Sequence, residues 1–131
     1  MNKFIHIELN TGDVKQAKKF YQGLFDWKMA DVPMGPMKYT TISTGKRGEG
    51  GGITQKPMAE APTQWLPYVL VDSVKRTIAK AQKRGAQIVV AYQPISGMGA
   101  LGVFIDPTGA ALGVWEMAPT TKKAAKKAKK K

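Results

Sequence analysis

Residues 4–24 of the chain, FIHIELNTGDVKQAKKFYQGL, join a strand pattern to a helix pattern. Along residues 4–9 aliphatic side chains alternate with aromatic or polar ones, as in a strand whose two faces meet different surroundings. From Val14 onward apolar residues recur at spacings of three and four, which predicts an amphipathic helix. Asp13 is the expected N-cap, because its carboxylate can accept hydrogen bonds from first-turn amides. The segment therefore predicts a strand followed directly by a helix.

The same pattern returns in the second half of the chain. Residues 66–85, LPYVLVDSVKRTIAKAQKRG, again give a strand and then a helix, which opens at Asp72-Ser73 and ends at Gly85. Three more strands are expected after each helix, at 27–30, 39–43 and 51–54 and at 87–92, 101–105 and 110–116. The sequence therefore predicts an α+β fold in which a βαβββ module occurs twice.

Length and charge divide the chain into a body and a tail. The 131 residues suit a single domain, expected at 1–118, with modules at 3–58 and 64–118. Residues 119–131 are rich in Lys and Ala and are predicted to be a disordered tail. Seven lysines between 122 and 131 supply more than half of the net charge of +12, so the body is only mildly basic.

Composition excludes several classes of site. The chain has no cysteine, which excludes disulfides, thiol nucleophiles and cysteine metal ligands. No apolar run approaches the roughly 20 residues that a membrane-spanning helix needs. The first residues show no signal-peptide pattern, so a cytoplasmic location is expected.

Three short strings identify a family resemblance. They are HIEL at 6–9, AKKFYQGLFDW at 17–27 and DPTG at 106–109, before the last expected strand. With the repeated module, they resemble the vicinal oxygen chelate superfamily, which contains glyoxalases, bleomycin-resistance proteins and dioxygenases. The resemblance covers about residues 3–118 and implies two half-barrels that form a curved sheet around a cleft, with helices outside. It also implies a homodimer, but a shared fold does not select one activity among the isomerases, dioxygenases and sequestering proteins of the family.

At the metal site, the sequence of this chain departs from the pattern of the family that it resembles. In the metal-dependent members that this chain resembles, four strands each supply one ligand, usually His or Glu. His6 occupies the first of these positions, whereas the others fall on Leu66, on Gly113 and near 51–53, where no donor exists. Glu116 has the wrong strand parity to replace them. No metal is therefore expected, and a divalent Zn, Ni, Mn or Fe site with differently aligned ligands is the alternative.

Strand alternation supplies the candidate catalytic residues. It directs Phe4, His6 and Glu8 to the cleft and Ile5, Ile7 and Leu9 beneath the helices. His6 and Glu8 are the candidates, because histidine titrates near neutrality and serves as a general acid or base or as a hydrogen-bond donor. The alternative is that His6 is structural and is hydrogen-bonded to Glu8 or to a neighbouring strand.

The same alternation supplies the candidate ligand-binding residues, which are Tyr39, Thr41, Leu66, Tyr68, Leu70, Gly113 and Trp115. Such an apolar and aromatic lining is typical of sites for small organic molecules. The alternative is that these residues form barrel core. Glycines at 51, 52 and 113 either leave space for a ligand or mark bulges. The methionine-containing loops 32–38 and 92–100 are expected to be lids or ordinary connections.

Three functions follow from these patterns. The first is a small-molecule-binding protein or metal-independent enzyme of the glyoxalase/bleomycin-resistance type. The second is a metal-dependent lyase or dioxygenase. The third is a nucleic-acid-associated protein that acts through the lysines of 122–131, which would bind phosphates without sequence preference. The alternative for the lysines is a solubilising tail.

Overall fold

The computed structural model describes residues 1–46 and 49–119, and within these ranges the chain forms eight strands and two helices. The predicted tail, from 120 onward, lies outside the described residues. The elements, in chain order, are β1 (Phe4–Thr11), α1 (Val14–Leu24), β2 (Lys28–Met34), β3 (Met37–Ser43), β4 (Gly50–Gln55), β5 (Gln64–Leu70), α2 (Val74–Lys83), β6 (Gln87–Ile95), β7 (Gly99–Ile105) and β8 (Ala111–Met117). The repeated βαβββ order is therefore confirmed.

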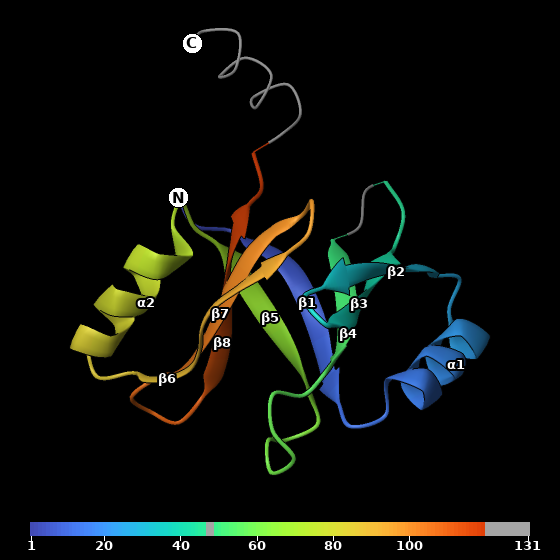
Figure 1. Ribbon diagram of the computed structural model, residues 1–131, viewed down its shortest axis with the longest axis horizontal. Helices are drawn as coiled ribbons and strands as arrows, with labels where there is room; N and C mark the ends of the chain where they lie inside the picture. The colour runs from blue at the N-terminus through green and yellow to red at the C-terminus, as the bar shows by residue number, and fades with distance from the viewer. Residues whose placement is uncertain (47–48, 120–131) are drawn as a thin grey trace, which may run out of the picture.

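All eight strands belong to one sheet, in the order β2-β3-β4-β1-β5-β8-β7-β6 (Figure 1). In each module the first strand pairs in parallel with the fourth, and the two modules join through the antiparallel pair β1–β5. β2 and β6, the two ends of the order, contact each other, so the sheet curls into a half-barrel. The helices α1 and α2 lie on opposite flanks (Figure 1).

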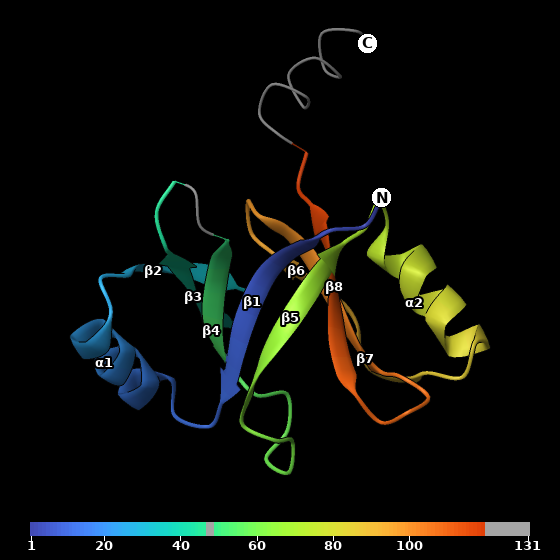
Figure 2. The ribbon, with the colours of Figure 1, turned by 180° about the vertical axis from the view of Figure 1, so that it is seen from behind.

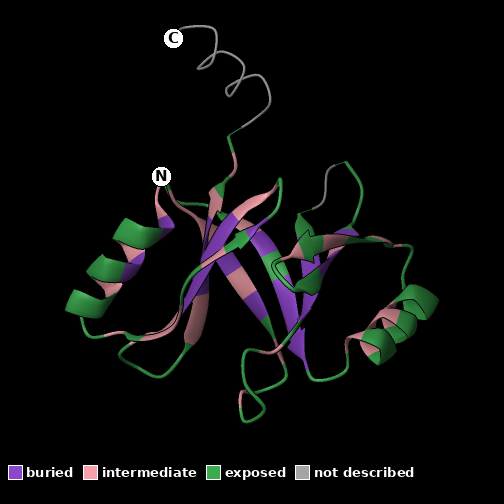
Figure 3. Ribbon diagram, in the orientation of Figure 1, coloured by how far each residue is buried: buried purple, intermediate pink, exposed green. Residues whose placement is uncertain are grey.

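The apolar side chains form one cluster inside the curl and one beneath each helix. The inner cluster consists of Tyr39, Leu66, Tyr68, Ile95, Leu101, Val103 and Trp115. Leu9, Ile42 and Ile53 pack beneath α1, and Val74, Ile78 and Val114 pack at α2. Figure 3 shows the buried segments on the sheet strands, whereas most of both helices is exposed. The interior of the curl is thus filled by side chains from both modules.

The predicted helix ends are confirmed. Asp13 Oδ1 accepts a hydrogen bond from the Gln16 amide at 3.0 Å, and Ser73 Oγ caps α2 in the same way at 3.2 Å. Gly85 has a φ of +101°, which favours glycine directly after a helix. Neither described helix is long and apolar enough to cross a membrane.

The alternation predicted for β1 is correct for Leu9 and wrong for Ile5 and Ile7. Ile5 packs against the inner cluster, because the β1–β5 register shifts between Phe4 and His6 and breaks the alternation. Ile7 keeps its outward direction but is 44% exposed. Figure 2 shows why: neither helix covers the outer face of β1 and β5 at the centre of the sheet.

The two methionine-containing loops, expected to be lids or ordinary connections, belong to β-hairpins. β2 continues through Pro33 to Met34, which pairs with Met37 across a turn at Gly35, and β6 continues to Ile95. Pro33 fits a strand here because β2 is an edge of the sheet and leaves one side of its backbone unpaired. The connections are therefore shorter than the Gly and Pro content suggested.

Candidate functional site

His6 lies on the inner face of β1 against aromatic rings. Its ring stacks on Trp115 with centroids 4.7 Å apart and meets Tyr68 edge-on at 5.6 Å. Its Nε2 shares a hydrogen bond with the Tyr39 hydroxyl, and its Nδ1 has no partner among the described residues. Burial lowers the pKa of His6 to about 4, so the imidazole is neutral at pH 7. The ring therefore presents one nitrogen that is free to bond with a ligand.

Glu8 is buried behind His6 and is held by side chains of both modules. Its Oε2 accepts hydrogen bonds from the Tyr68 hydroxyl at 2.6 Å and from Asn10 Nδ2 at 2.8 Å. Its Oε1 has no partner in the described part of the chain. Burial raises the pKa of Glu8, and the hydrogen bonds from Tyr68 and Asn10 oppose that rise. The carboxyl group of Glu8 is thus shielded from solvent, at the centre of a polar network within the apolar cluster.

Tyr39 is hydrogen-bonded to His6 and lies near the carboxyl group of Glu8. Burial, with the nearby charge of Glu8, raises its pKa well above 10, so its hydroxyl keeps its proton. That hydroxyl carries one proton, so it either donates to His6 Nε2 or accepts a hydrogen bond from it. When the hydroxyl accepts, His6 donates through Nε2, which leaves Nδ1 as a hydrogen-bond acceptor. The tautomer of His6 therefore sets whether Nδ1 accepts or donates.

Two tyrosines occupy the space at two of the positions where metal-dependent relatives would place ligands. A Cβ atom at Gly52 would overlap the hydroxyl of Tyr39, and one at Gly113 would overlap the ring of Tyr68. Gly52 pairs with Glu8 and Gly113 with Tyr68, so both glycines adjoin the His6–Glu8 strand or its neighbour. The ligand space considered for these glycines is thus filled by the protein itself.

The donor set does not fit the divalent ion of the family. Within 1–46 and 49–119, no three or more His, Asp or Glu side chains are grouped so that they could hold a metal. His6 and Glu8 are neighbours on one strand, but Oε2 of Glu8 is already bonded to Tyr68 and Asn10. A site of three or four protein ligands would require donors that this interior lacks.

An open pocket of about 380 Å³ lies at one end of the inner cluster. Its lining consists of Ile5, His6, Gly97, Met98, Trp115 and Met117. The His6 side chain is the polar side chain of that set, apart from the indole nitrogen of Trp115. A concave, mostly apolar hollow with few polar groups is the usual form of a small-molecule site, and this volume is within the usual range.

The structure brings most of the predicted site residues together, but in two layers. His6 and Trp115 line the pocket, with Glu8 behind them. Tyr39, Leu66 and Tyr68 are at most 2% exposed and lie inside the packed cluster, not on the pocket wall.

The three remaining candidates lie apart from the pocket wall. Gly113 lies under the Tyr68 ring. The Thr41 hydroxyl donates to the Ala30 carbonyl on β2. Leu70 ends β5, where its carbonyl accepts a hydrogen bond from Asn2. None of the three lines the pocket, so Trp115 is the predicted ligand-binding residue that lies in its wall, beside the catalytic candidate His6.

Sequence reasoning missed three residues of the site and included a fourth, Met98, only as part of a methionine-containing loop. Asn10 shares the strand face of His6 and Glu8, so the same alternation would have found it. Met98 and Met117 line the pocket from a hairpin and from the end of β8, and methionine near glycine was the signal for Met98. Ile5 carried no signal, because a register shift places it in the lining.

Comparison with known proteins places this geometry in a family. The sequence model of the Glyoxalase/Bleomycin resistance protein/Dioxygenase superfamily matches residues 3–114. A putative glyoxylase of Mycobacterium bovis is 32% identical over 114 residues, which cover 84% of this chain and 44% of the relative. An anthracycline biosynthesis protein of Streptomyces peucetius is 30% identical over 125 residues, with coverages of 82% and 44%. The chain thus spans less than half the length of these curated relatives.

Solved structures share the fold at low sequence identity. Methylmalonyl-CoA epimerase of Mycobacterium tuberculosis has a TM-score of 0.64 at 12% identity, covering 93% of this chain and 91% of its own. A hypothetical protein of Bacillus halodurans C-125 has a TM-score of 0.62 at 16% identity, with coverages of 89% and 95%. These likenesses establish the architecture alone.

Proposed function

The chain belongs to the glyoxalase/bleomycin resistance protein/dioxygenase superfamily, and we propose that it binds a small, largely apolar organic molecule in the His6 pocket without a metal. The observation that carries the proposal is the pocket itself, an apolar hollow with a neutral histidine in its wall. Trp115 and two methionines offer apolar surface, and His6 Nδ1 offers one hydrogen bond. The ligand class that fits is an aromatic or aliphatic molecule with one polar group placed to meet His6.

The filled positions at Gly52 and Gly113 support binding without a metal. A carboxylate or imidazole at either position would collide with Tyr39 or Tyr68, each of which is fully buried. In a metal-independent member, proton transfer would fall to His6, because Nδ1 is an acceptor when Nε2 donates to the Tyr39 hydroxyl. The metal-dependent lyase or dioxygenase remains the competing function, and it requires an ion held by His6.

We expect Met98→Glu to weaken binding of the organic ligand by at least about tenfold. The substitution places a carboxylate in an apolar lining. A ligand that binds there must strip water from that carboxylate, which costs binding free energy. A neutral anthracycline aglycone, the ring system of the class named by one relative, is a suitable first titrant in calorimetry because it is largely planar and lacks the cationic amino sugar. Met58→Glu is the matched control, since Met58 is 47% exposed and outside the pocket lining, and it should change the affinity less than about twofold.

Native mass spectrometry of protein purified without chelator decides between the two functions. An organic adduct with no metal supports the proposal, and Met98→Glu should remove that adduct. One Zn, Ni, Mn or Fe ion per chain, lost on His6→Gln, would replace the proposal with the metal-dependent alternative. Equal weakening by Met98→Glu and Met58→Glu would show that the pocket is not the binding site.

We also propose that a second copy of the chain covers the outer face of α1. The face is defined by five exposed apolar residues, Ile7, Phe20, Leu24, Phe25 and Trp65, which are 37–60% exposed. Tyr21 joins them, because it meets the rings of Phe20, Phe25 and Trp65. Contiguous exposed aromatic surface of this kind is typical of association sites. The curated relatives are more than twice as long as the matched region, so each has room for a second such domain.

Light scattering coupled to size exclusion should therefore give twice the 14.3 kDa mass of the chain. Phe20→Lys with Leu24→Lys should shift the mass to that of a monomer, because two charges would be buried unpaired in the contact. Phe4→Lys is the control, as Phe4 is 62% exposed but outside the α1 face, and the dimer should persist. A monomeric wild-type protein would refute the interface.

A further inference from the structure

Two ring nitrogens in the wall of the His6 pocket have no hydrogen-bond partner among the described residues. They are Nδ1 of His6, whose Nε2 is bonded to the Tyr39 hydroxyl, and Nε1 of Trp115. Within 1–46 and 49–119, the partnerless side-chain atoms that are fully enclosed are Glu8 Oε1 and Thr54 Oγ1, and neither ring nitrogen is among them. Since His6 and Trp115 are otherwise buried, both nitrogens are open to the hollow that their rings line.

The two open nitrogens require different partners, and a hydroxyl group suits both. The rings of His6 and Trp115 stack with their centroids 4.7 Å apart, so the nitrogens belong to one patch of the wall. Trp115 Nε1 donates only, whereas His6 Nδ1 accepts or donates according to its tautomer. A ligand hydroxyl can accept from the indole and can either donate to Nδ1 or accept from it. It therefore fits whichever tautomer the Tyr39 contact selects, which a carbonyl group, an acceptor only, does not.

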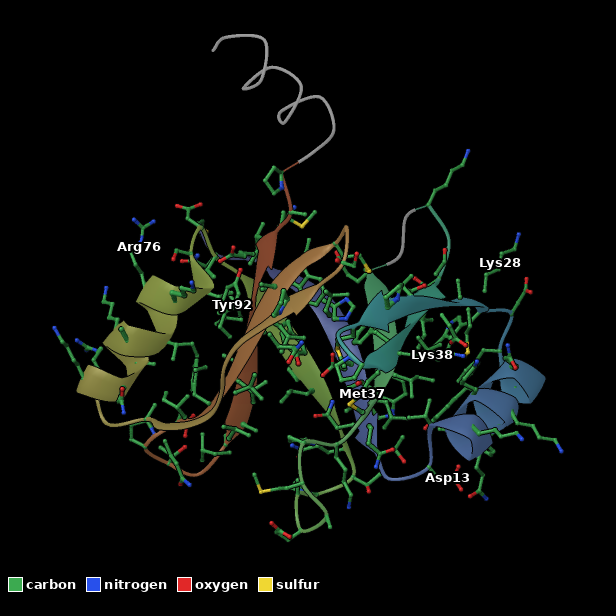
Figure 4. The ribbon with its side chains drawn as sticks, in the orientation of Figure 1. Asp13, Lys28, Met37, Lys38, Arg76 and Tyr92 are labelled. Carbon is green, nitrogen blue, oxygen red and sulfur yellow. The ribbon has the colours of Figure 1, made fainter. Side chains whose placement is uncertain are left out.

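The described part of the pocket wall offers no charge to a ligand. Its lining residues include no Lys, Arg, Asp or Glu, and His6 is neutral at pH 7 because burial lowers its pKa to about 4. The titratable group behind it, Glu8, is neutral or negative and so gives an anion no attraction. In Figure 4 the labelled cations Lys28 and Arg76 extend outward from opposite flanks of the molecule. An anionic ligand would therefore lose its water without gaining an opposite charge.

We propose that the His6 pocket selects uncharged aromatic molecules that carry a hydroxyl group, such as phenols, and holds the hydroxyl between His6 Nδ1 and Trp115 Nε1. The thioethers of Met98 and Met117 in the same wall favour an aromatic ligand, because sulfur makes favourable contacts with aromatic rings. The inference rests on the binding function proposed above, and it adds the chemical class of the ligand and the two atoms that recognise it.

The test uses the full-length chain at pH 7 and naphthalene derivatives that differ in one substituent. 2-Naphthol is uncharged and carries a hydroxyl, 2-methylnaphthalene carries a methyl group of similar size that forms no hydrogen bond, and 2-naphthoate is an anion. Calorimetry gives each affinity. The indole N–H signal of Trp115 in a nitrogen-15 NMR spectrum, assigned by its loss in Trp115→Phe, shows whether the probe binds in the pocket.

Two variants remove one nitrogen each and keep an aromatic ring. His6→Phe removes Nδ1, and Trp115→Phe removes the indole nitrogen and keeps the proposal testable if His6→Phe does not fold. Trp65→Phe is the matched control, because the Trp65 indole donates to Tyr21 outside the pocket lining. Thermal unfolding shows which variants retain the fold. The quantity compared is the affinity of 2-naphthol relative to that of 2-methylnaphthalene, so a general change in the shape of the pocket cancels.

In the wild type, 2-naphthol should bind at least about thirtyfold more tightly than 2-naphthoate, because the carboxylate loses its water without a counter-charge. The preference for 2-naphthol over 2-methylnaphthalene should fall at least about fivefold in each pocket variant and less than about twofold in Trp65→Phe. Equal affinities for 2-naphthol and 2-naphthoate, or an unchanged preference in either folded pocket variant, would overturn the inference and leave the proposed function standing. If none of the probes moves the Trp115 signal, the proposed function fails as well.

Discussion

Replacing Gly113 with alanine is expected to lower the free energy of unfolding by about 3 kcal/mol, at the upper end of the cost of overfilling a core. The new Cβ would overlap the Tyr68 ring. That ring cannot withdraw, because its hydroxyl donates to Glu8 and its sides meet His6 and Trp115. In a denaturant titration the midpoint should fall with little change in slope, and the melting temperature should drop by roughly 10 °C.

The matched control for this prediction is Gly23→Ala in α1. A Cβ at Gly23 meets nothing within 4 Å, and alanine is the better helix former. This variant should be more stable than the wild type by about 0.5 kcal/mol. Similar losses in both variants would contradict the tight packing of Tyr68 on the backbone of β8, and with it the argument that a ligand side chain at 113 has no room.

The order of strands and helices could be predicted from sequence, because local signals define each element and the same βαβββ pattern occurs twice. Asp13 begins α1 and Gly85 follows the end of α2, and both signals act within a few residues. The two modules also repeat one pattern. The strand positions of Gly52 and Gly113 were also predictable, since they depend on counting along a strand. The side chains that fill the space above these glycines were not predictable. Tyr39 and Tyr68 reach the glycines across strand pairs and through the curl of the sheet.

The pocket was less predictable than the residues behind it, for the same reason. Alternation along β1 correctly directed His6 and Glu8 inward, but a register shift placed Ile5 beside them. Met98 enters the lining because the tip of the β6–β7 hairpin packs near the end of β8, where Ala118 donates a hydrogen bond to its carbonyl. Such contacts join residues distant in sequence and leave no periodic signal.

Lowering the pH from 7 to 4 is expected to cost about 3 kcal/mol of unfolding free energy through His6. Burial lowers the folded-state pKa of His6 from 6.5 to about 4. Between these values the unfolded chain binds a proton on the imidazole that the folded protein does not bind. Stability therefore falls as the pH falls through this window, and the loss is nearly complete at the folded pKa.

Glu8 changes the unfolding free energy with pH in the opposite direction from His6. Substitutions are therefore needed to distinguish the contributions of the two residues. Its raised pKa means that the folded protein keeps a proton above 4.5, the ordinary value, where the unfolded chain has lost it. This contribution to stability decreases as the pH rises, whereas that of His6 increases. Glu8→Gln should therefore make the acid loss steeper than in the wild type, because the opposing contribution is gone.

His6→Gln isolates the histidine, since glutamine does not titrate and can still bond with the Tyr39 hydroxyl. The stability difference between wild type and His6→Gln, from denaturant titrations at each pH, should shift by about 3 kcal/mol between pH 7 and pH 4 in favour of the variant. Parallel pH curves for the two proteins would contradict the prediction. They would mean that the imidazole takes up protons as readily in the folded protein as in the unfolded chain, and that the pocket wall at His6 is wet and not apolar.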